Sequence, residues 1–306
     1  LSIDPKVVES ERGVVISERS TGLENSPIRV LFEGITGQAF AEHPYHWPVI
    51  GYLDDMKNWK QADLERYFKT YYAPNNCVVV ISGAVKLADV KALAEKYLEP
   101  IPAQPAPPEV PTKEPEQRGE RRIVMEKKVA NPYLGIGWHT PEAKHDDYYA
   151  LSILSDLLTQ GQSSRLYTRL VDQKQLVTSV FANYNESFDP TLFTIAATLS
   201  RGATTDAVEK EIYEELESIK KNGVTPEELE KVKNRKLISF YRQIETINGK
   251  SNNLGTYELF FGDYKKLFDA PEMYNKVTIE DIKRVATTYF TKPNRTVGIL
   301  KANVEE

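Results

Sequence analysis

Two glutamates near the start of the chain have a spacing that could support shared chemistry. Glu11 and Glu18 are seven positions apart, so on a helix they lie two turns apart on the same face. Val8, Val14 and Val15 lie close to them in sequence, and we expect Val14 to face inward. A carboxylate pair beside apolar side chains is costly to bury unless a cation or hydrogen bonds compensate. The pair therefore predicts either a cation site or the exposed face of a charged helix.

The histidines offer a second candidate metal site. The chain has four, His43, His46, His139 and His145, and the first two share the segment His43-Pro44-Tyr45-His46 with Glu42 before it. A proline directly after the first histidine constrains the turn, and the spacing fits no standard helical zinc pair. A structural loop is therefore the favoured interpretation, and a metal-binding module on this segment is the rival hypothesis.

Composition limits the class of protein. The chain has 306 residues, enough for two domains, and a net charge of −5 with Lys and Arg interleaved among Asp and Glu. We expect no nucleic-acid partner and, without an apolar run of about eighteen residues, no membrane span. The single cysteine, Cys77, excludes an internal disulfide, and we expect it to be buried in a strand over 77–81. The compartment stays open between bacterial periplasm and cytoplasm.

A proline-rich stretch divides the sequence. Seven of the eighteen prolines lie from Pro100 to Pro115, and proline fixes φ and lacks an amide proton. We therefore predict an extended linker over 100–120 between domains at 1–99 and 121–306.

The two sides of this linker contain matching features. A helix with an aromatic pair, a proline and an apolar strand occur over 63–81 and again over 281–300. Upstream, Asp4-Pro5 and Thr225-Pro226 both carry a helix start signal. From Pro5 to Pro74 is 69 residues and from Pro226 to Pro293 is 67, so the sequence predicts a duplicated domain with an offset near 220.

The duplication predicts an incomplete first copy. About a hundred residues of the second copy precede Thr225, whereas three residues precede Asp4. In the second copy we expect strands over 122–129, 133–139, 177–184 and 192–199 and helices over 146–159, 205–222 and from 227 to about 253. The predicted fold class is α+β, with two duplicated domains, each a mainly antiparallel sheet covered by helices on one face, and the first domain truncated.

The acidic pair belongs to one copy only. With Pro5 aligned to Pro226, Glu11 stands opposite Val232 and Glu18 opposite Ser239. This difference favours a first domain that holds a metal and a second that does not.

Several motifs now carry a family resemblance. They are Glu11-Arg12-x-x-Val15-x-x-Glu18, His43-Pro44-Tyr45-x-x-Pro48-Val49-Ile50-Gly51, the run from Asp63 to Gly83, and Ser163-Ser164-Arg165-Leu166-Tyr167. In this order they resemble the pitrilysin, or inverzincin, metallopeptidases, whose relatives include mitochondrial processing peptidase and insulin-degrading enzyme. The resemblance extends over nearly the whole chain.

The resemblance implies a zinc site that this chain does not complete. In the family an H-x-x-E-H helix supplies two histidine ligands and a glutamate general base, and a distant glutamate completes the Zn²⁺ site and leaves a position for water. By position that glutamate is Glu18, and Glu11 matches a supporting acid. No H-x-x-E-H occurs in the sequence, so the chain alone should be inactive.

The resemblance also bears on substrate and partners. It implies hydrolysis of peptides or unfolded polypeptides in a two-domain chamber. Family members that act alone carry an Arg and a Tyr for the substrate backbone, and those positions here are Val171 and Thr178, neither of which can replace a guanidinium. We therefore expect a homo- or heterodimer with a related subunit. The alternative is a non-catalytic family member that serves as a scaffold or partner of an active peptidase.

Overall fold

The structure is a computed structural model that describes residues 3–302. The chain forms two compact units. Unit 1 contains the described residues up to 22 together with 48–111 and 241–267, and unit 2 contains 23–47, 112–240 and the described residues from 268. Each unit therefore includes a segment from the other half of the sequence.

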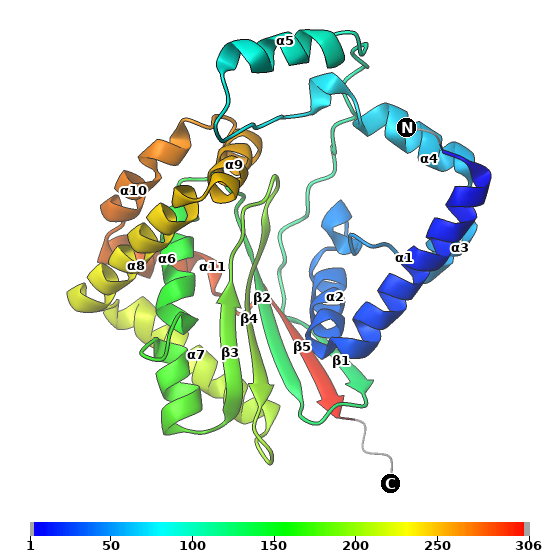
Figure 1. Cartoon of the computed structure of the whole chain (residues 1–306). Helices are drawn as coiled ribbons and strands as arrows, with labels where there is room; N and C mark the ends of the chain where they lie inside the picture. Colours follow the sequence, from blue (N-terminus) through cyan, green and yellow to red (C-terminus); the bar gives the residue numbers. More distant parts are fainter. Residues whose placement is uncertain (1–2, 303–306) are drawn as a thin grey trace. The chain divides into compact units, whose positions relative to one another are not determined.

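Helices dominate the chain (Figure 1). The α-helices are α1 Pro5–Asn25, α2 Pro27–Ala39, α3 Leu53–Asn58, α4 Gln61–Tyr71, α5 Leu87–Tyr97, α6 Tyr148–Thr159, α7 Thr205–Asn222, α8 Pro226–Glu245, α9 Ile247–Thr256, α10 Lys266–Lys276 and α11 Ile279–Tyr289. Two π-helical segments are η3 Tyr167–Gln173 and η4 Tyr257–Phe261. The strands are β1 Arg121–Lys127, β2 Tyr133–Thr140, β3 Val177–Asn183, β4 Thr191–Leu199 and β5 Arg295–Ala302.

Unit 2 is built on one five-stranded sheet of order β1-β5-β2-β4-β3. β1 pairs with β5 in parallel, and every other neighbouring pair is antiparallel. The mainly antiparallel α+β fold predicted from the sequence is confirmed in this unit.

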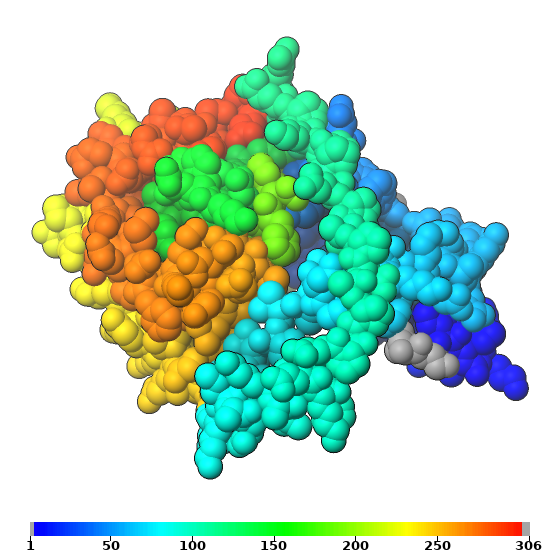
Figure 2. Space-filling view, turned by 90° about the horizontal axis from the view of Figure 1, so that it is seen from above, coloured from blue at the N-terminus to red at the C-terminus, as the bar shows by residue number. Residues whose placement is uncertain are grey.

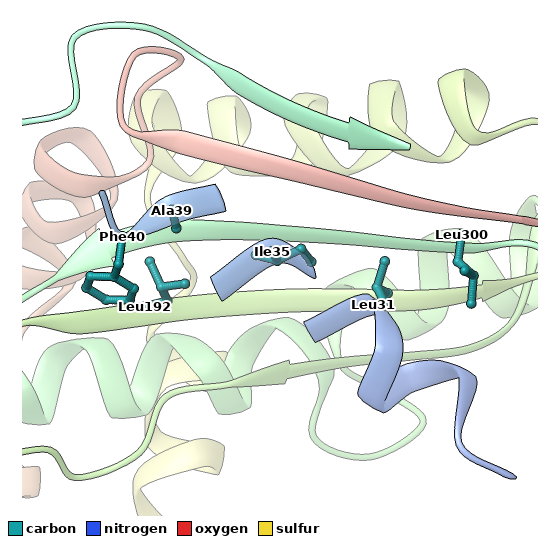
Figure 3. Packing of buried hydrophobic residues seen from close by; sticks show 6 residues of the cluster. All are labelled: Leu31, Ile35, Ala39, Phe40, Leu192 and Leu300. Carbon is teal, nitrogen blue, oxygen red and sulfur yellow. The ribbon is translucent and has the colours of Figure 1, made fainter. Parts of the chain in front are cut away.

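Both faces of this sheet are covered by helices. Alternate residues of a strand point to opposite faces, so β2 contributes side chains to both. On one side the ring of Trp138 lies 5.0 Å from that of Phe290, at the end of α11. On the other side Gly135 faces Ile35 of α2, and a Cβ added to that glycine would lie 2.5 Å from the isoleucine Cδ1. Figure 3 shows Leu31 and Ile35 of α2 directed at the strands. The sequence predicted helices on one face, and α2 adds cover on the second.

Unit 1 contains helices but, within its described residues, no strand. The predicted strand over 77–81 is wrong: the segment runs without sheet pairing, and Cys77, predicted to be buried, is exposed. The physical reason is that a strand needs a hydrogen-bonded neighbour, and unit 1 supplies none among its described residues. The helix α5 has no buried residue, and its cyan segment stands on the surface in Figure 2.

The predicted helix starts are confirmed. The amide of Lys6 donates to the Asp4 carboxylate over 2.8 Å, and the amide of Glu228 donates to the Thr225 hydroxyl over 3.2 Å. The helix predicted from 227 to about 253 is instead two helices, because the Thr246 hydroxyl accepts from the amide of Gly249 and starts α9 anew. Among residues 3–302, none of the helices combines the length and the apolar character that a membrane crossing requires.

Candidate functional site

Glu11 and Glu18 lie on α1, as predicted, and both side chains are exposed. Neither forms a hydrogen bond or an ion pair with any residue of the described chain. By contrast, Glu9 on the same helix pairs with Arg12 over 2.9 Å. Val14, which we expected to face inward, is 56% exposed, so the apolar neighbour on this side of α1 is open to solvent as well.

Two arginines orient α1. Arg12 donates to the carbonyl oxygens of Met56 over 2.5 Å and of Trp59 over 2.7 Å. Arg19 is buried, with its guanidinium 5.6 Å from the centre of the Tyr52 ring. Glu11 and Glu18 each precede one of these arginines by one position, which is about 100° around the helix. Holding the two arginines in place therefore also fixes the direction in which the two glutamates point.

The described residues do not make a zinc site by themselves. Between residues 3 and 302 there is no group of three His, Cys, Asp or Glu side chains placed to hold a metal ion. This contradicts the rival module on His43 and His46. His43 is buried and accepts from the Tyr45 amide over 3.2 Å, and His46 pairs with the Phe40 carbonyl over 2.8 Å, so both rings hold the loop after α2 in shape.

Val171 and Thr178 fall on different elements of unit 2. Val171 is half-buried in η3, and Thr178 is exposed on β3, where its hydroxyl donates to the Thr198 carbonyl over 3.3 Å. Neither side chain carries a positive charge that could bind a peptide backbone.

Two arginines close to Val171 in the sequence, Arg165 and Arg169, pair with glutamates of α7 and α8. Arg165 binds Glu228 through two parallel hydrogen bonds of 2.8 and 2.7 Å and Glu215 through a third of 3.0 Å. Arg169 pairs with Glu211 over 2.6 Å. Burial lowers the pKa of Arg165, but its interactions with Glu228 and Glu215 outweigh burial, and the pKa lies above its ordinary value. Sequence reasoning missed this network because the arginines and their partners are 42 to 63 positions apart.

A second arrangement that the sequence did not reveal is an acid clamp at the end of α2. The Glu114 carboxylate accepts from the amides of Ala41, Glu42 and His43 at 2.8, 2.9 and 3.0 Å. Arg121 lies 3.8 Å away and donates to the last carbonyls of α2, which lack helical partners. Burial raises the pKa of Glu114, but the three amides outweigh it, and the pKa lies below its usual value. The clamp fixes α2 in place beside the sheet.

Replacing Glu114 by glutamine should lower the free energy of unfolding of unit 2 by about 2 kcal/mol at pH 7, because the charged acceptor is lost. The pKa of Glu114 is lower in the folded state than the unfolded value of about 4.3. Its contribution is therefore complete above that value and is lost as the pH falls through the folded pKa. Urea titrations at several pH values should show the difference in stability between wild type and Glu114→Gln narrowing progressively as the pH falls below about 4.3. The exposed neighbour Glu116→Gln is the matched control. An equal gap at every pH would refute the clamp.

Comparison with known proteins places this fold and these residues in one family. The family described as "Peptidase M16 inactive domain" matches residues 58–236. "Zinc protease PqqE" of Helicobacter pylori is 34% identical over 294 residues, which cover 95% of this chain and 66% of the relative. "Probable mitochondrial-processing peptidase subunit beta" of Schizosaccharomyces pombe is 22% identical over 302 residues, which cover 94% of this chain and 64% of the relative.

A solved structure supports the same relationship. The crystal structure of a protease from Helicobacter pylori superposes with a TM-score of 0.94 at 33% identity and covers 98% of this chain and 73% of that one. The chain thus spans about two thirds of the length of the curated relatives named above. Because the family match covers more than half of the 306 residues, the chain belongs to the M16 peptidases, the pitrilysin-type family that its motifs predicted.

Proposed function

We propose that this chain is the glutamate-bearing part of a zinc metalloendopeptidase that hydrolyses peptides or unfolded polypeptides. In this proposal Glu18 is the third protein ligand of the zinc ion and Glu11 supports it. The histidines and the general base come from an H-x-x-E-H helix that lies outside these 306 residues. The chain alone is inactive.

The observation that carries the proposal is the state of the two carboxylates. Both lie on one face of a helix that Arg12 and Arg19 hold in place, and both are exposed without a partner in the described residues. Carboxylates without a partner can bind a cation without first breaking an ion pair. The relative from Helicobacter pylori is named a zinc protease, which supports zinc as that cation.

The proposal is tested by comparing residues 1–306 with the product of the complete reading frame that encodes them. We expect about one zinc ion per complete polypeptide and none for residues 1–306, measured by metal analysis after dialysis. The complete product should also cleave an unstructured peptide with a quenched fluorophore, and a chelator should stop the cleavage. A complete product without zinc and without cleavage would exclude the peptidase function.

The second candidate is a non-catalytic partner subunit. It is favoured by the match to a family described as an inactive domain and by Val171 and Thr178 at the positions expected to bind substrate. If the same experiment gives no zinc, we expect the complete product to raise the activity of a related zinc-bearing subunit on mixing. An unchanged rate would remove this candidate.

A further inference from the structure

We propose that Arg12 and Arg19 are positioning residues for Glu11 and Glu18. By binding the two ends of α3, they hold the two carboxylates in the direction and at the spacing that a zinc site needs. The inference rests on the proposed function and adds to it the residues of this chain that set the geometry of the site. The two arginines act through α1 and contact neither substrate nor metal.

The buried side of α1 includes two cations. Val15 and Ile16 are partly buried, and Arg12 and Arg19 lie one turn before and one turn after them on the same side of the helix. The Arg12 side chain is 14% exposed, and Arg19 is 8% exposed. A buried cation destabilises a fold unless partners compensate, so both side chains need partners.

Both arginines have partners at α3, which runs antiparallel to α1. Arg12 donates to the carbonyl of Met56 in the last turn of α3 and to that of Trp59 just after it. Arg19 lies over the ring of Tyr52, the residue that precedes α3. The side chain of Met56 is fully buried, so α3 is itself held in unit 1.

The two contacts have the same spacing as the carboxylates. Tyr52 and Trp59 are seven positions apart, as are the two arginines, and seven positions also separate Glu11 from Glu18. The contacts therefore span the two turns of α1 that carry the acidic pair. A metal site needs its side chains held within about 0.5 Å by residues that are themselves fixed. The planar fork of an arginine on two carbonyls restricts rotation of α1 about its axis.

The second copy of the repeat supplies a comparison without the acidic pair. With α1 and α8 aligned at their first prolines, Arg12 stands opposite Lys233 and Arg19 opposite Phe240. Lys233 is 8% exposed and donates to the carbonyl of Asn275, near the end of α10, over 2.9 Å. Phe240 is 9% exposed. One lysine and one aromatic ring therefore occupy the anchoring positions of α8.

The two copies differ at these anchors in the same way as at the carboxylates. α8 has Val232 and Ser239 where α1 has the glutamates, and it keeps a cation at only one of the two anchoring positions. α1 has a forked arginine at the first position and a second cation at the other, although a cation is more costly to bury than an aromatic ring. Packing alone does not require both arginines, so the precision that they add serves the carboxylates.

The test replaces each arginine in the complete product by the residue of the second copy. Arg12→Lys keeps a cation and loses the fork, and Arg19→Phe keeps a buried group and loses the cation. We expect each to weaken zinc binding at least about tenfold in competition with a zinc indicator, as for other residues that orient a ligand. Hydrogen exchange of the amides over 12–19 in the zinc-free protein should become at least about tenfold faster.

Lys233→Met is the matched control, because it removes the equivalent anchor of α8. It should speed exchange in α8 and leave the zinc affinity within about twofold of wild type, since α8 carries no ligand of this site. If Arg19→Phe does not fold, Arg12→Lys alone decides.

Three outcomes would overturn the inference: unchanged zinc affinity in either folded arginine variant, an equal loss in Lys233→Met, or weaker zinc binding without faster exchange over 12–19. The last would show an effect of charge rather than of position. A complete product of unaltered sequence that binds no zinc rejects the proposed function itself. Zinc binding that is the same with and without the two arginines rejects this inference alone, so the two failures are distinct.

Discussion

Glu18→Gln in the complete protein should lower zinc affinity more than about 100-fold and abolish peptide cleavage. Glutamine keeps the shape of the side chain and removes the charge that a zinc ligand needs. Loss of a residue that only supports a ligand costs about 10- to 100-fold, so Glu11→Gln should have this smaller effect. Competition with a zinc indicator gives both affinities.

Glu24→Gln is the matched control, because Glu24 is exposed on the same helix and stands outside the stripe of Glu11 and Glu18. It should leave zinc binding and cleavage unchanged. Zinc affinity that survives Glu18→Gln would show that the third ligand lies elsewhere and would reduce Glu18 to a surface carboxylate.

The second large effect is expected at Arg165. Arg165→Ala removes the guanidinium between Glu228 and Glu215 and leaves two partly buried carboxylates without their cation. We expect the free energy of unfolding of unit 2 to fall by about 3 kcal/mol, measured by urea denaturation followed by circular dichroism. Arg165→Lys keeps the charge without the forked pair of donors and should lie between alanine and wild type.

A control separates this network from ordinary surface pairs. Lys210 and Glu214 form an exposed pair of 3.8 Å on α7, so Lys210→Ala should change stability by less than about 1 kcal/mol. Equal losses at Arg165 and Lys210 would mean that the buried network adds nothing specific.

Local signals in the sequence were sufficient for much of the fold. Asp4-Pro5 and Thr225-Pro226 mark helix starts through contacts within three residues, and the structure contains those contacts. The strand predicted over 77–81 failed because strand formation depends on a neighbour that no local pattern specifies. The position of α2 was equally hidden, since it depends on Ile35 meeting glycines about 100 and 260 positions away.

Part of the candidate site could likewise be predicted from local sequence, and part could not. The spacing of Glu11 and Glu18 correctly placed both on one helix face, because helical periodicity is local. Their role as zinc ligand and support stays a prediction. The clamp at Glu114 could not be predicted, because its carboxylate reaches amides more than seventy positions away.

The interleaving of the two units has a consequence for how this protein can be divided. α2, from the first half of the sequence, covers the sheet of unit 2, and α9, from the second half, is part of unit 1. If a cut in the proline-rich stretch allowed the two halves to separate, α2 would leave Gly135 and Gly298 and expose the apolar sheet face that it covers. The two halves could exist as separate gene products only if they remained associated. The proline-rich stretch is therefore a tether between mutually dependent parts.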